Sequence, residues 1–112
     1  MSTYTPDTWV LLKICTGGHC VYKVLAGWGG SYLYGASWKL NSGCTKFEQD
    51  GDYFNFSGYS GSVYSCHKNA YGLSGYTAQV LKSFEEQIKD QPGSSITVMP
   101  EDTKWSELNY GD

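Results

Sequence analysis

Cysteines and histidines carry the strongest chemical potential in this sequence of 112 residues. Cys15, His19 and Cys20 stand close together, and Cys66 precedes His67 further along the chain. Thiolate and imidazole are preferred zinc ligands, so Cys15, His19, Cys20 and Cys66 form a candidate metal set. The set lacks a C-x2-C pair, and adjacent residues such as Cys66 and His67 point to opposite faces of a strand. A minor structural metal site is therefore an alternative function, and we predict no cofactor.

The pair Cys15 and Cys20 has two other interpretations. Gly17-Gly18 predicts a two-residue turn that places these cysteines opposite each other, at a position where Cα atoms lie about 4.5 Å apart. That geometry permits a disulfide, whereas the expected compartment opposes one. The N-terminus, MSTYTPDTW, lacks the basic and apolar regions of a signal peptide, so we expect a cytoplasmic protein with reduced thiols. Free thiols, a disulfide and metal ligation all stay open.

Known catalytic motifs are missing from the sequence. We find no nucleophile elbow, phosphate-binding loop, H-E-x-x-H motif or dinucleotide fingerprint. The pairs Cys66 with His19 and Cys20 with His67 have the residue types of a nucleophile and a base. Core packing of cysteine and a solvated turn histidine explain these residues equally well. We therefore predict that the protein is not an enzyme.

Aromatic residues exceed what a core of this size needs, with ten tyrosines and four tryptophans. Tyrosine combined with glycine and serine is typical of recognition surfaces, because the ring gives a large contact area at a low entropic cost. The predicted binding surface consists of Tyr32, Tyr34, Trp38, Lys46, Tyr53, Tyr59 and Tyr64. This composition favours a small binding protein that acts through protein–protein association.

The charge balance bears on a second alternative, binding of single-stranded nucleic acid. The net charge is −3, and all eight basic residues are lysine. Arginine supplies the planar fork that binds phosphate and guanine, and single-strand binders place a cationic groove beside their aromatic rings. Nucleic-acid binding is therefore an alternative that the charge and the lack of arginine disfavour. No apolar run reaches membrane-spanning length, so we expect no membrane partner.

The stretch from Cys44 to His67 predicts three strands joined by tight turns. Asp50-Gly51 predicts a two-residue turn that places Gln49 opposite Asp52. Side chains alternate along both flanking strands. One face carries Thr45, Phe47, Phe54 and Phe56, and the other carries Lys46, Glu48, Tyr53 and Asn55. A third strand, from Ser62 to Cys66, completes a sheet with one apolar face and one wet face.

A strongly apolar hairpin precedes this stretch, with strands at residues 9–15 and 20–28. Both of its faces are largely apolar, so a helix, barrel closure or another subunit must cover them. One helix is predicted near residues 74–90, with Ser74 or Thr77 as its cap and apolar residues on one stripe. A strand at 95–99 follows. Residues 100–112 form an acidic C-terminal arm that Trp105 and Leu108 anchor to its own domain or to a neighbour.

This pattern predicts a single domain, residues 1–112, of the α+β class with mostly β structure. We expect a strongly bent antiparallel sheet or a small SH3-like or Sm-like barrel of about six strands. The doubly apolar hairpin and the C-terminal arm predict a homo-oligomer.

Two segments, GGSYLYGASWKLNSG and DGDYFNFSGYSGSVYSCHKNAYG, resemble a group of small uncharacterised proteins of marine tailed bacteriophages. The resemblance covers roughly the first two-thirds of the chain and includes no catalytic motif. It implies a phage or marine metagenome origin and expression in a bacterial cytoplasm. It also implies an accessory role in which the protein binds a host or phage component, and it assigns a function to no residue.

Overall fold

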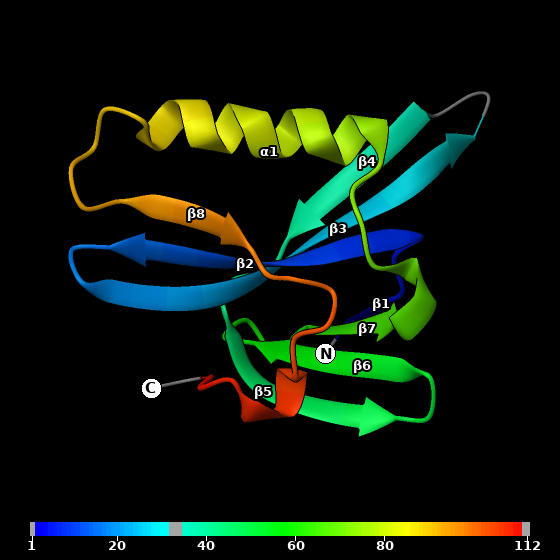
Figure 1. Ribbon diagram of the computed structural model, residues 1–112. Coiled ribbons are helices and arrows are strands. Elements are labelled where there is room, and N and C mark those ends of the chain that lie inside the picture. Colours follow the sequence, from blue (N-terminus) through cyan, green and yellow to red (C-terminus); the bar gives the residue numbers. More distant parts are fainter. Residues whose placement is uncertain (1, 32–34, 111–112) are drawn as a thin grey trace.

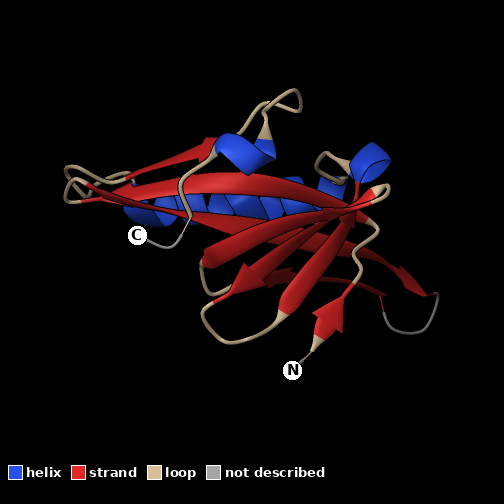
Figure 2. Ribbon diagram, turned by 90° about the horizontal axis from the view of Figure 1, so that it is seen from below, coloured by secondary structure: helices blue, strands red, loops and turns tan. Residues whose placement is uncertain are grey.

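The computed structural model describes residues 2–31 and 35–110 (Figure 1). These residues form two four-stranded sheets and one α-helix, α1, in three layers. The hairpin sheet has the order β4-β3-β2-β8, and the meander sheet has the order β1-β7-β6-β5. Seen from below (Figure 2), the meander sheet lies in front and α1 lies behind the hairpin sheet. The predicted α+β class with mostly β structure is confirmed.

The hairpin sheet is antiparallel throughout and contains the strands β2 (Thr8–Thr16), β3 (His19–Ser31), β4 (Gly35–Leu40) and β8 (Ser95–Val98). Gly17 and Gly18 form the turn between β2 and β3 with φ values of 59° and 82°. Glycine adopts positive φ at almost no cost, and a turn with two such residues matches the twist of a hairpin. The predicted pairing of Cys15 with Cys20 is confirmed.

Helix α1 (Gly75–Ile88) covers one face of the hairpin sheet. Ser74 caps its N-terminus, and Thr77 completes the reciprocal capping box. Because apolar residues recur with helical spacing, one stripe of α1 faces the sheet. The core on this side consists of Val10, Leu12, Leu25 and Leu81, with Val80, Phe84, Ile96 and Val98 packed against them. The predicted helix and its apolar stripe are confirmed.

The meander sheet contains β1 (Thr3–Tyr4), β5 (Cys44–Asp50), β6 (Tyr53–Gly58) and β7 (Val63–His67). Its first turn lies at Gly51-Asp52, so Asp50 pairs with Tyr53, and the predicted pairing of Gln49 with Asp52 is wrong. Gly51 has a φ of 59°, and no other described residue of this turn has a positive φ, which fits a type II′ turn. An even shift of register keeps the side chains from Lys46 to Phe56 on their predicted faces.

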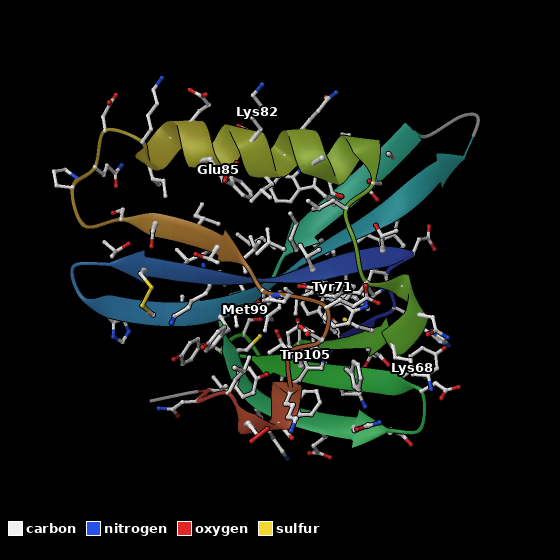
Figure 3. All side chains as sticks on the ribbon, in the orientation of Figure 1. Lys68, Tyr71, Lys82, Glu85, Met99 and Trp105 are labelled. Atoms are coloured by element: carbon white, nitrogen blue, oxygen red, sulfur yellow. A yellow bond between two sulfur atoms is a disulfide. The ribbon has the colours of Figure 1, made fainter. Side chains whose placement is uncertain are left out.

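The meander sheet packs its phenylalanine face against the second face of the hairpin sheet. Trp9, Leu11, Val24 and Ala26 contribute from the hairpin sheet, and Cys44, Phe56, Tyr64 and Cys66 contribute from the meander sheet. A bulge between Cys44 and Lys46 brings Cys44 into this core in place of Thr45. Trp105, in the 3-10 turn Trp105–Glu107, docks on the same core, as Figure 3 shows. The arm therefore anchors to its own domain.

The structure differs from the sequence analysis in two places. The two sheets form a sandwich of eight described strands, so the predicted barrel of about six strands is wrong. Thr3 and Tyr4 form β1, a strand that the sequence analysis did not predict, and β1 pairs in parallel with β7. Both faces of the first hairpin are covered within the chain, so the hairpin itself no longer supports the predicted homo-oligomer, which stays a prediction. Among the described helices, none has the length and apolar character needed to span a membrane.

Candidate binding cleft between two edge strands

A cleft of about 450 Å³ lies where the edge strands of the two sheets approach each other. We name it the edge cleft; its lining residues are Thr3, Tyr4, Thr5, Trp28, Ser37, Trp38 and Lys39. Within the described chain, β1 pairs with β7 alone and β4 pairs with β3 alone. The edge cleft is therefore bordered by two strands that each have an unpaired side.

Strand alternation decides which side chains enter the edge cleft. Trp28 pairs with Ser37, and Gly27 pairs with Trp38. Neighbouring residues on a strand point to opposite faces, so Trp28 and Ser37 face the meander sheet. Trp38 lies on the other face, where its ring meets Phe84 of α1 edge-to-face at 5.4 Å. The edge cleft thus reaches around the margin of β4 from one face to the other.

The aromatic wall of the edge cleft is held in place by contacts within the chain. Trp28 donates its indole N–H to the C=O of Thr5 at 3.0 Å, and its ring lies edge-on to Tyr4 at 6.3 Å. The Nζ atom of Lys39 lies 5.0 Å from the centre of the Tyr4 ring, a cation–π geometry. These contacts preorganise two rings and one positive charge on the surface, with Trp38 38% exposed beside them.

Backbone groups on the margin of β4 add a second kind of contact. Asn41 donates its N–H to the C=O of Val24 at 3.1 Å, so this position is a hydrogen-bonded one in the β3–β4 ladder. Hydrogen-bonded and non-hydrogen-bonded pairs alternate in antiparallel sheets, so Trp38 and Leu40 are at non-hydrogen-bonded positions. Their N–H and C=O groups therefore point away from β3, toward the open side of the sheet.

The predicted binding residues are dispersed over the molecule. Trp38 lines the edge cleft, whereas Tyr64 is only 4% exposed and belongs to the core. Tyr59 is 60% exposed at the turn between β6 and β7. Lys46 and Tyr53 lie on the outer face of the meander sheet, and Tyr32 and Tyr34 lie outside the described residues. The structure therefore does not bring the described members of this set together on one surface.

On the outer face of the meander sheet, the polar and aromatic side chains contact one another. Lys46 forms an ion pair with Glu48 at 2.6 Å, and this hydrogen bond raises the pKa of Lys46. The ring of Tyr53 packs edge-to-face on His67 at 5.1 Å. This face therefore presents paired charges and a packed ring, in contrast to the open wall of the edge cleft.

Six of the seven lining residues of the edge cleft were missing from the predicted surface, among them Tyr4, Trp28 and Lys39. Trp28 stands at the end of an apolar run, a pattern that indicates a core residue. Tyr4 belongs to a strand of two residues, which is too short to show a periodic pattern. One signal in the sequence could have identified Lys39. Neighbouring residues on a strand point to opposite faces, so Lys39 lies on the face of β4 opposite to the Trp38 side chain.

The predicted metal set is not assembled. Cys15 and Cys20 form a disulfide, and His19 is exposed beside them at the hairpin turn. Cys66 is buried in the meander sheet, on the strand face opposite to His67. Over residues 2–31 and 35–110, no group of three or more histidine, cysteine or acidic side chains has a geometry that holds a metal ion.

The two free cysteines, Cys44 and Cys66, are core residues. Burial raises the pKa of Cys44 to about 11, although a hydrogen bond from Asn41 partly opposes this shift. Burial also raises the pKa of Cys66. Both thiols are therefore protonated at neutral pH, which removes them as nucleophiles.

Comparison of the chain with protein-family models, with curated proteins and with solved structures found no match. The geometry of the edge cleft is therefore the basis for a functional proposal.

Proposed function

We propose that this chain is a non-enzymatic binding protein that captures an extended polypeptide segment in the edge cleft. One observation carries the proposal: the unpaired margin of β4 runs beside a preformed wall of Tyr4 and Trp28. Proteins that bind peptides by strand addition combine these two features, since backbone hydrogen bonds give affinity and side-chain pockets give specificity. Trp38 and Leu40 would supply the backbone groups.

The chemistry of the edge cleft indicates the composition of the segment. The rings of Tyr4 and Trp28 suit an apolar or aromatic side chain. Lys39 suits an acidic side chain two residues away, because alternate residues of an added strand point to the same face. We propose a phage or host polypeptide with this pattern as the partner, and the bacterial cytoplasm as the compartment.

Nucleic-acid binding has weaker support. A single-strand binder needs several cations beside its aromatic rings. Lys39 is the one lysine among the described residues that line the edge cleft. Four other lysines pair with acidic residues, namely Lys46 with Glu48, Lys68 with Asp52, Lys89 with Glu86 and Lys104 with Glu107. The positive charges of these lysines are therefore partly neutralised by the neighbouring carboxylates.

Labelled heptapeptides test the proposal, with a phenylalanine and a glutamate two residues apart in an alternating threonine background. We expect saturable binding, with amide chemical-shift changes centred on Trp38 and Leu40. Lys39→Glu should weaken binding by at least about tenfold, because it places like charges together. Lys82→Glu is the matched control: Lys82 projects from α1 away from the sheets (Figure 3), and affinity should be unchanged.

A peptide with the same side chains but N-methylated backbone amides separates strand addition from simple ring contact. We expect it to lose binding, since it cannot donate to the C=O groups of Trp38 and Leu40. Equal binding of both peptides would contradict the proposal. Salt-dependent binding of oligothymidylate instead of the peptides would support the nucleic-acid alternative. Dimerisation in sedimentation that Lys39→Glu abolishes would assign the edge cleft to a second copy of the chain.

A further inference from the structure

The disulfide between Cys15 and Cys20 stands at the open end of the hairpin sheet, where Figure 3 shows it as the yellow bond joining β2 to β3. A separate cavity of about 280 Å³ lies against it. We name it the tip cavity; its lining includes Lys13, Cys20, Tyr22, Cys44 and Tyr59. The disulfide is therefore part of a concave surface that contains a lysine and two tyrosines.

Strand alternation explains how the tip cavity forms. Cys15 pairs with Cys20, and Lys13 pairs with Tyr22, so all four side chains share one face of the hairpin. Further along the same face, Leu11 and Val24 are covered by the meander sheet. The meander sheet ends before it reaches the turn between β2 and β3. The part of the hairpin face next to that turn is therefore uncovered, and it forms a wall of the tip cavity.

The two sulfur atoms differ in their access to a ligand. Cys20 is exposed and lines the tip cavity, whereas Cys15 is half-buried and does not line it. A thiolate attacks one sulfur of a disulfide and expels the other, so the accessible sulfur is the one attacked. An incoming thiol in the tip cavity therefore meets the Sγ atom of Cys20.

The fold does not depend on this bond for its local geometry. Strand β2 pairs with β3 through nine residues, from Thr8 to Thr16, and pairs with β8 on its other side. The turn between the cysteines already has the two glycines it requires. A disulfide contributes most when it closes a long loop, and this one closes a short loop that the strands close by themselves. Opening the bond therefore leaves the strand pairs in place.

We propose that Cys20 is a thiol–disulfide exchange site for a small thiol that carries a negative charge. The thiolate of that molecule forms a bond to the Sγ atom of Cys20, and the bond between Cys15 and Cys20 breaks. The electron pair leaves with the Sγ atom of Cys15, which takes a proton from water. Attack by the Cys15 thiolate on the mixed disulfide reverses the step and releases the small thiol.

Charge and size select the thiol. Lys13 places a positive charge in the lining of the tip cavity, two residues from Cys15 on the same face. A cavity of 280 Å³ admits a small molecule and not a folded protein. In a reducing cytoplasm an accessible disulfide is typically transient and redox-sensing, which fits an exchange site better than a permanent crosslink.

Glutathione is the probe for the first test, with 2-mercaptoethanol as its neutral counterpart. The full chain is treated with either thiol under native conditions, quenched with N-ethylmaleimide and mapped by mass spectrometry. We expect Cys15 to be alkylated while Cys20 carries the added thiol as a mixed disulfide. Cys20 is alkylated only where a second thiol molecule has attacked that mixed disulfide and left as the oxidised dimer of the small thiol. Cys44 and Cys66 should stay unmodified, and the circular dichroism should be unchanged. A bond that opens only in denaturant would overturn the proposal.

Two variants test the site and its charge. In Cys15→Ser, oxidised glutathione should leave one stable adduct on Cys20, and an adduct on Cys44 or Cys66 in its place would refute the assignment. Lys13→Gln should slow opening by glutathione on the order of threefold to tenfold and slow opening by 2-mercaptoethanol less, because the 2-mercaptoethanol thiolate lacks the carboxylates of glutathione. Lys23→Gln is the matched control, since Lys23 lies on the opposite face of β3. Equal slowing of both thiols by Lys13→Gln would overturn the selection of an anionic thiol.

Discussion

Trp9→Ala is expected to lower the free energy of unfolding by about 3–5 kcal/mol, the range for removing a large buried ring. Trp9 is 1% exposed and touches three parts of the fold. Its ring lies 5.5 Å from Phe56 in the meander sheet, 4.6 Å from Tyr71 and 5.6 Å from Trp105 in the arm. The substitution therefore leaves a cavity where both sheets and the arm meet.

Urea unfolding followed by circular dichroism measures this loss, and Trp38→Ala is the control. Trp38 is 38% exposed and contacts one aromatic ring, so its removal should cost far less. Trp9→Phe separates two contributions. The indole N–H donates to the C=O of His67 at 2.8 Å, and losing that bond at a part-buried site costs about 1–3 kcal/mol. Equal destabilisation by Trp9→Ala and Trp38→Ala would show that the sandwich core is not centred on Trp9.

Elements that depend on neighbouring residues were predictable from the sequence. The turn at Gly17-Gly18 fixed the pairing of Cys15 with Cys20, because a two-residue turn allows one register. Alternation in the meander identified the phenylalanine face. The turn lies one residue further along than predicted, which shifts the pairing register by two residues and leaves that face unchanged. These features follow from a local period of two, which a single sequence displays directly.

The packing of one sheet on the other was not predictable, because it depends on contacts between distant segments. In the structure, Gly27 in β3 lets α1 approach the hairpin sheet closely, a contact that no local pattern of the sequence predicts. The edge cleft combines residues 3–5 with residues 37–39, and the strand that brings them together, β1, is two residues long. No periodic pattern identifies a strand of that length.

A tyrosine hydroxyl between two strands shows the same limit. Leu11 donates its N–H to the hydroxyl of Tyr71 at 3.3 Å, and that hydroxyl donates to the C=O of Met99. The hydroxyl of Tyr71 thus bridges the N–H of Leu11 and the C=O of Met99, two backbone groups that would otherwise pair directly where β2 runs beside the end of β8. Burial raises the pKa of Tyr71 to about 12, so the hydroxyl keeps its proton at neutral pH. Nothing in the sequence distinguishes Tyr71 from the other nine tyrosines.

Gly27→Ala should destabilise the fold by about 1–3 kcal/mol, the usual range for adding a methyl group to a packed core. A Cβ atom at Gly27 would lie 2.5 Å from the Cγ2 atom of Thr77 on α1. Thr77 cannot move away freely because it completes the helix cap. Ser74 donates its N–H to the Oγ1 atom of Thr77 at 2.9 Å, and Thr77 donates its N–H to the Oγ atom of Ser74 at 3.1 Å.

The double variant Gly27→Ala/Thr77→Ser should recover most of this loss. Serine keeps the hydroxyl that completes the cap and lacks the methyl group that meets the new side chain, so the two substitutions are coupled. Thr77→Ser alone should cost about 1 kcal/mol for one buried methyl group. Urea unfolding of all four proteins gives the coupling free energy, which we expect to be stabilising. Gly29→Ala is the matched control, since the nearest atom to its Cβ is an Asp7 oxygen at 3.5 Å. Additive losses in the double variant would show that contact with Thr77 is not why glycine is required at residue 27.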